Sequence, residues 1–96
     1  MYEETKLAVR KAFEISKLLF SMGSKYSKLV DATSNIKVPT EEEVKHLISD
    51  RITLEKAIII ELKNRYKTAA KTAGFDEKYG IALLEYISLH KEMNEQ

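Results

Sequence analysis

The sequence contains no cysteine, no tryptophan, one proline and three glycines among its 96 residues. Without cysteine the chain has no disulfide, no thiolate metal site and no cysteine nucleophile. The longest uninterrupted apolar run is four residues, as at Ala57–Ile60, far below the roughly 20 residues of a membrane-spanning helix. Because proline and glycine are so few, we expect few turns and long secondary-structure elements.

An excess of charge of one sign is also lacking, because 16 basic residues face 15 acidic ones, giving a formal net charge of +1. Dedicated nucleic-acid-binding domains usually carry a clear basic excess, so the total does not favour that class. The first residues, MYEETKLAVRK, contain no apolar signal-peptide core. We therefore expect a cytoplasmic protein without a membrane segment, forming a single helical domain over residues 1–96.

Helical periodicity is the main pattern in the sequence. Apolar residues recur at spacings of three and four in the first third, from Ala8 to Leu29, and again over 52–73 and 79–93. Thr40 and Glu43 have the spacing of a capping box, Gly74 suits the end of a helix, and Asp76 suits the cap of the next one. The sequence predicts an all-α, three-helix antiparallel bundle of the coiled-coil type, with helices near 3–34, 41–73 and 77–94. A break at Gly23 would make four helices.

The predicted helix lengths differ, and the difference predicts an interface. At 1.5 Å per residue, a central helix over about 41–73 would extend ~50 Å, but the last helix only ~27 Å. Positions 41–55 would then lack one neighbour although they carry several apolar side chains, which a partner would cover. Alternatively, a broken first helix folds over this gap and gives a monomeric four-helix bundle. The predicted partner interface comprises Val44, Leu47, Ile48, Arg51, Ile52, Leu54 and Glu55.

Residues with catalytic or binding chemistry are few. His46 has Glu42 four residues before it, but a metal site usually needs three or four ligands, so we predict no metal, no cofactor and no catalytic residue. Four lysines lie near one face of the predicted central helix and could follow a phosphate backbone, although the near-zero net charge favours a solvated outer face as the explanation. These possible nucleic-acid contacts are Lys56, Lys63, Lys67 and Lys71.

Two stretches, VRKAFEI and TAGFDEKYGIALLEYI, resemble the first-helix signature and the entry to the last helix of the all-helical chorismate mutases. The resemblance implies an intertwined dimer that isomerises chorismate to prephenate without a cofactor. It would give substrate-binding roles to Arg10, Lys25, Lys37 and Gln96. The family's acidic–arginine–acidic signature at the second helix is replaced here by EEEVKH.

The sequence thus favours a non-enzymatic helical interaction module that self-associates or acts as an adaptor or subunit of a larger assembly. Its expected partner is a second copy of the chain or another helical protein. Two alternatives stay open, a chorismate mutase-like enzyme and a nucleic-acid-binding protein that uses the lysine face.

Overall fold

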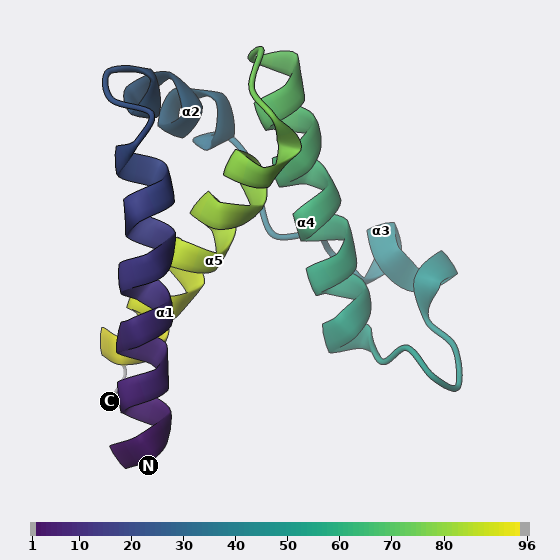
Figure 1. Cartoon of the computed structure of the whole chain (residues 1–96). Helices are drawn as coiled ribbons and strands as arrows, with labels where there is room; N and C mark the ends of the chain where they lie inside the picture. The colour runs from purple at the N-terminus through teal and green to yellow at the C-terminus, as the bar shows by residue number, and fades with distance from the viewer. Residues whose placement is uncertain (1, 95–96) are drawn as a thin grey trace.

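A computed structural model of the chain describes residues 2–94, and the side chains of residues 3–91 (Figure 1). Within this range the protein contains only helices, which confirms the predicted all-α class. The number of helices differs from the predicted three or four, because both longer predicted helices are broken. The elements are α1 (Tyr2–Phe20), α2 (Lys25–Thr33), α3 (Glu41–Val44), a 3-10 helix η1 (Lys45–Leu47), α4 (Leu54–Thr72) and α5 (Glu77–Asn94).

The first predicted helix, 3–34, is divided by a turn at residues 21–24. Gly23 has a φ of +61°, in the left-handed region that glycine enters without a Cβ clash. Amides of the turn donate to carbonyls three residues earlier, as Gly23 does to Phe20 over 3.1 Å. The apolar rhythm continues through the turn because α1 and α2 both contribute to the same core, although they are separate helices.

The second predicted helix, 41–73, is wrong as a continuous element. Ile48 is extended, with φ −73° and ψ 134°, and regular helix resumes only at Leu54. The Ser49 hydroxyl accepts hydrogen bonds from the amides of Arg51 and Ile52 at 3.3 and 3.2 Å. Thr53 then caps α4 by accepting from the amide of Lys56 at 3.3 Å. These short polar side chains satisfy backbone amides outside a helix, which is why the helix breaks here.

The predicted helix start at Thr40 and the predicted helix end at Gly74 are both confirmed. Thr40 and Glu43 form a reciprocal capping box, with the Thr40 amide donating to Glu43 Oε1 at 3.0 Å. Gly74 ends α4 with a φ of +90°. Asp76 Oδ1 accepts from the amide of Lys78 at 2.9 Å and so caps the start of α5.

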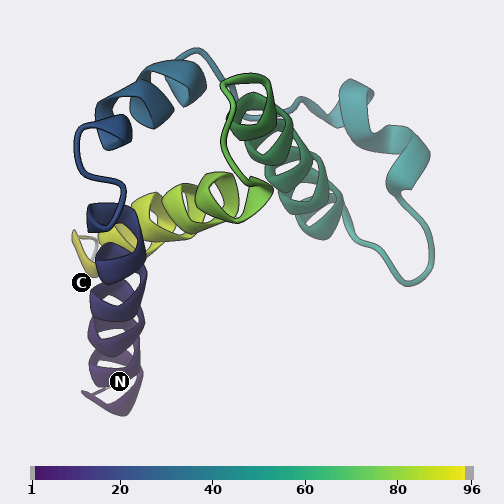
Figure 2. The ribbon, with the colours of Figure 1, turned by 45° about the horizontal axis from the view of Figure 1, so that its top comes forward.

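The helix at the centre of the fold is α5, not the predicted segment 41–73. Both α1 and α4 pack along α5, α2 lies across α4 and α5, and α3 with η1 covers α4 (Figures 1 and 2). No extended contact joins α1 to α4. The buried core lies where α5 meets its neighbours and comprises Leu19, Leu29, Tyr66, Ala70, Ala82, Leu83 and Leu84.

Gly80 allows the close approach of α5 to α4. A Cβ at this buried position would overlap the carbonyl group of Tyr66 and lie 3.1 Å from Cβ of Ala70. The obstacle is backbone, which cannot rotate aside as a side chain does. The absence of a side chain at Gly80 therefore sets the distance between the two helices.

The fold is thin and covers its apolar residues incompletely. Its shortest dimension is 19 Å, about two helix diameters, and its Cα radius of gyration is 14.5 Å. A compact chain of this length would have a radius near ~12.5 Å. The accessible surface is 7142 Å² for 11.0 kDa, whereas size scaling predicts about 5,600 Å² for a monomer. The molecule thus exposes much more surface than a compact monomer of its mass.

Candidate interaction surfaces

The predicted partner interface at positions 44–55 lies mainly on α3, η1 and the loop before α4. Val44 is completely buried within its own chain, and Leu47 and Ile52 are partly buried. Ile48 and Leu54 keep 38% and 36% of their surface exposed, and Arg51 and Glu55 are also exposed. The break at 48–53 lets α3 fold back onto α4, so the length mismatch that motivated this interface does not exist. Val44 is therefore inaccessible to a partner.

A polar contact fixes α3 against α4. Arg65 Nη2 donates to Glu43 Oε2 at 2.7 Å, and Arg65 Nη1 donates to the carbonyl oxygen of Lys37 at 3.3 Å. The Thr40 amide first, and then the Arg65 guanidinium, lower the pKa of Glu43 to about 2. Glu43 therefore serves the helix cap and the packing of α3 at the same time, and it stays ionised at neutral pH.

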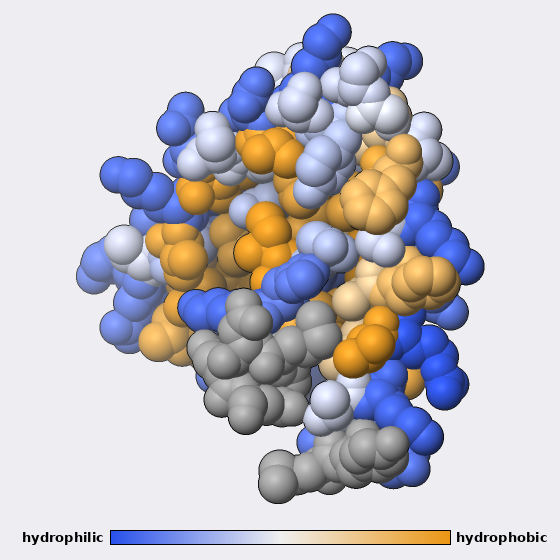
Figure 3. Space-filling view, turned by 90° about the vertical axis from the view of Figure 1, so that its left-hand side faces the viewer, coloured by the Kyte–Doolittle hydropathy of each residue, from blue (hydrophilic) through white to orange (hydrophobic). Residues whose placement is uncertain are grey.

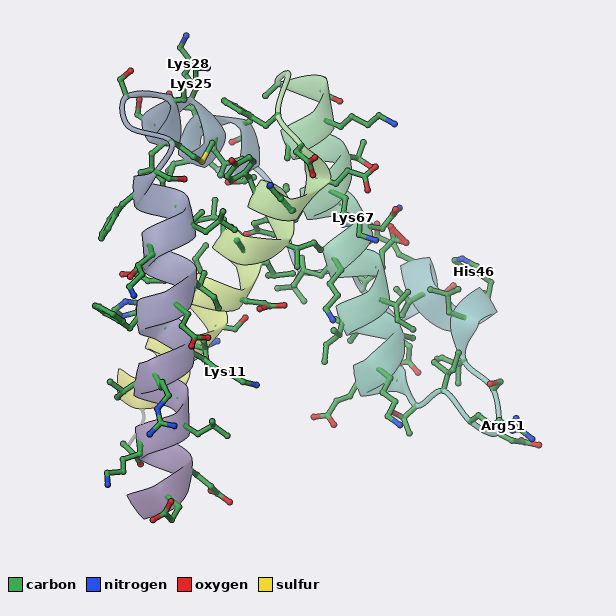
Figure 4. All side chains as sticks on the ribbon, viewed as in Figure 1. Lys11, Lys25, Lys28, His46, Arg51 and Lys67 are labelled. Carbon is green, nitrogen blue, oxygen red and sulfur yellow. The ribbon has the colours of Figure 1, made fainter. Side chains whose placement is uncertain are left out.

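The four lysines predicted as nucleic-acid contacts all lie exposed on α4. Lys71 approaches Glu77 at 3.9 Å, whereas Lys56, Lys63 and Lys67 make no ion pair with the described residues. Lys63 and Lys67 line a shallow depression beside His46 and the exposed Ile60; Figure 4 labels Lys67 and His46. The predicted basic face is thus present, but apolar side chains are interspersed in it.

A groove on α5 separates α1 from α4. Leu84 and Leu89 of α5 and Ile59 and Leu62 of α4 supply its apolar lining. Lys11 projects from α1 toward this gap (Figure 4). The groove exists because α1 and α4 both pack on α5 without packing on each other.

Three strongly exposed apolar side chains lie on one side of α1, where we did not predict a surface. Val9, Phe13 and Phe20 are 52%, 61% and 69% exposed. At 100° per residue these three side chains fall within about 40° of arc, on the side of α1 opposite Lys11. We call them the α1 stripe. The signal in the sequence was the apolar pairing at positions 8–9, 12–13 and 19–20, which gives α1 two apolar faces rather than one.

The α1 stripe remains open to solvent on its own chain. Among the described residues, Phe13 of the stripe has one cation–π contact, with the Lys17 ammonium 4.5 Å from its ring centroid. Figure 3, which faces this side of the molecule, shows hydrophobic residues gathered at the surface among hydrophilic ones. An exposed apolar surface on so small a chain is typical of an interaction site.

The residues matched to the chorismate mutases do not meet in one cavity. Arg10 lines a small depression with acidic neighbours on α1, and Lys25 lines a separate one beside Gly74 at the other end of the helix. Lys37 lies in the loop after α2, and Gln96 lies outside the described residues. Chorismate mutase activity stays a prediction from the sequence.

Three further observations concern metals, membranes and known proteins. The described residues include no group of three or more histidine, aspartate or glutamate side chains arranged to hold a metal ion. None of the helices, over the described residues, has the length and apolar content to span a membrane. No family model, curated protein or solved structure matches this chain.

Proposed function

We propose that this protein is a small helical interaction module that self-associates through α1. The observation that carries the proposal is the α1 stripe, in which two phenylalanines and a valine on one side of a single helix are more than half exposed. Aromatic side chains are the commonest anchors of protein interfaces, and solvent exposure of these three forgoes their burial energy.

A second copy of the chain is the occupant that the charge pattern of α1 favours. The first turn of α1 carries Glu3 and Glu4 and its last turn carries Lys17, with Lys25 following at the start of α2; between these ends lie Lys6, Arg10, Lys11 and Glu14. In an antiparallel pair the acidic end of one copy would lie beside the basic end of the other. The same arrangement would set the two helix dipoles in opposite directions.

The spacing of the stripe suits this antiparallel arrangement. If residue i of one copy faces residue 29 − i of the other, Val9 lies opposite Phe20 and Phe13 lies opposite Ser16. Large side chains then face smaller ones, which is what close packing between two helices needs. The contact would be isologous, as in most homodimers.

The expected affinity is modest. Full burial of each large apolar side chain contributes about 1.5–3 kcal/mol, so covering the exposed half to two-thirds of three side chains contributes roughly 2–6 kcal/mol per copy. Association itself costs an estimated 4–15 kcal/mol. The balance predicts a dimer with a dissociation constant in the micromolar range or weaker.

Sedimentation velocity between about 1 and 500 µM tests the proposal, because a weak dimer changes its average mass across that range. We expect Phe13→Ser to shift the protein toward monomer. Leu7→Ser is the matched control, since Leu7 is 53% exposed on the same helix but lies about 140° away from the centre of the stripe. Ile48→Ser tests the interface predicted from the sequence.

Each result has a distinct meaning. A monomer throughout the concentration range would refute self-association. Equal weakening by Leu7→Ser would refute the assignment to the α1 stripe. Weakening by Ile48→Ser alone would retain self-association but move the interface to the region around 44–55.

A further inference from the structure

One cavity among the described residues is distinct from the α1 stripe and from the groove that carries Lys11. It has a volume of about 470 Å³ and lies between α2, α4 and α5. Figure 2 shows the three helices that supply its lining. Cavities that bind small molecules usually measure about 300–1,000 Å³ and are mostly apolar with a few polar groups.

Three tyrosines and a histidine supply the aromatic part of the lining. Tyr26 comes from α2, Tyr66 from α4, and Tyr86 and His90 from α5. The rings of Tyr86 and His90 contact edge to face, with centroids 4.5 Å apart. Aliphatic side chains, among them the buried Leu83, complete the lining. Aromatic rings from three helices therefore line one apolar space, which is open to solvent beside the exposed Ile87 and His90.

The cavity also contains a polar group without a protein partner. Tyr66 is only 9% exposed as a residue, but solvent reaches its hydroxyl, which makes no hydrogen bond to any described residue. Water can therefore hydrogen-bond to this hydroxyl, and a ligand in the cavity would take the place of that water. The Thr33 hydroxyl, by contrast, already donates to the carbonyl oxygens of Leu29 and Val30, each at 3.1 Å. Burial raises the pKa of Tyr66, so its hydroxyl is a protonated donor at neutral pH.

We propose that this cavity binds a small, uncharged, ring-containing molecule that accepts a hydrogen bond from the Tyr66 hydroxyl. The rings of the lining offer stacking and edge contacts to a planar ligand. The lining includes no lysine, arginine, aspartate or glutamate. A charged ligand would therefore lose part of its hydration without gaining an opposite charge, so the cavity favours an uncharged one. This inference does not depend on self-association.

Three naphthalene derivatives of similar size serve as probes because they differ in one chemical property at a time. 2-Acetylnaphthalene is neutral and accepts a hydrogen bond, 2-ethylnaphthalene is neutral and accepts none, and 2-naphthoate is charged. We expect saturable, sub-millimolar binding of 2-acetylnaphthalene in a titration followed by amide chemical shifts. Amides around Tyr66, Tyr86 and His90 should move most. 2-Ethylnaphthalene should bind more weakly, and 2-naphthoate weakest of the three.

Two variants test the contribution of the Tyr66 hydroxyl and the contribution of the open cavity separately. Tyr66→Phe keeps the ring and removes the hydroxyl, so affinity for 2-acetylnaphthalene should fall about two- to tenfold while that for 2-ethylnaphthalene stays the same. Val30→Trp should fill the cavity and abolish binding of both probes. Val30 lines the cavity and is 38% exposed, so the larger ring can extend into the open cavity without displacing core atoms, and the fold should persist. Ile59→Trp, at a half-exposed position in the groove, is the matched control and should leave binding unchanged.

Several results would overturn the proposal. One is the absence of saturable shifts around the cavity, and another is binding of 2-naphthoate as tight as that of 2-acetylnaphthalene. A Tyr66→Phe protein that loses the same affinity for both neutral probes would show that the hydroxyl does not bind the ligand. Binding that survives Val30→Trp would place the probes elsewhere. Circular dichroism melts of each variant establish that the titrated protein is folded.

Discussion

Replacing Gly80 with alanine tests the packing on which all of the surfaces depend. In an exposed helix the change from glycine to alanine stabilises by about 1 kcal/mol. Here the new Cβ would overlap the backbone of Tyr66. Overpacking of a core costs typically 1–3 kcal/mol, and a backbone obstacle places this site at the upper end or beyond. The helix-propensity gain and the overpacking cost together predict that Gly80→Ala lowers the free energy of unfolding by about 2 kcal/mol.

Thermal unfolding followed by circular dichroism measures this loss. For a chain of this size each kcal/mol lowers the midpoint by about 4–8 °C, so Gly80→Ala should melt roughly 8–16 °C below the parent protein. Asn64→Ala on the exposed surface of α4 is the control, and helix propensity alone should raise its stability by at most about 0.7 kcal/mol. The two substitutions should therefore shift the unfolding midpoint in opposite directions. A Gly80→Ala protein as stable as the control, or more so, would refute the close approach of α5 to α4.

Two further expectations follow from charged groups. The folded-state pKa of Glu43 is lowered to about 2 from 4.5, so its contribution to stability is complete above pH 4.5 and is lost as the pH falls toward 2. Denaturant unfolding should therefore find Glu43→Gln less stable than the parent at pH 7 and indistinguishable from it near pH 2; a constant difference would contradict this linkage. We expect no salt-sensitive binding to duplex DNA, because exposed isoleucines interrupt the lysine face. Binding that weakens steeply with salt and is lost in Lys63→Ala/Lys67→Ala would show otherwise.

Local signals in the sequence predicted the helix ends better than they predicted helix continuity. The capping box at Thr40, the turn at Gly74 and the cap at Asp76 each depend on one or two residues, and all three are present. The break at 48–53 also had local signals in Ser49 and Thr53. The apolar spacing around them nevertheless predicts one helix, because a loop that packs on its own chain keeps apolar residues at similar intervals.

The arrangement of the helices was less predictable because it depends on contacts between distant residues. Gly80 gave no sequence signal for packing, since a glycine in a helical pattern usually reads as a weakness. In the structure it marks where α5 meets Tyr66. The cavity likewise combines side chains from α2, α4 and α5, which no spacing rule relates. The α1 stripe, in contrast, is predictable from the sequence, because Val9, Phe13 and Phe20 alone define a second apolar face on α1.

The two proposed activities share α5 as their support but use different residues. Four residues lining the cavity belong to α5, and α1 packs along the same helix. Removing the Tyr66 hydroxyl should therefore impair ligand binding without changing the mass in solution, while Phe13→Ser should do the reverse. Gly80→Ala displaces α5 from α4 and should reduce both together. If Phe13→Ser also weakened binding of 2-acetylnaphthalene in fully monomeric protein, α1 would be supporting the cavity through α5, and the two sites would not be independent.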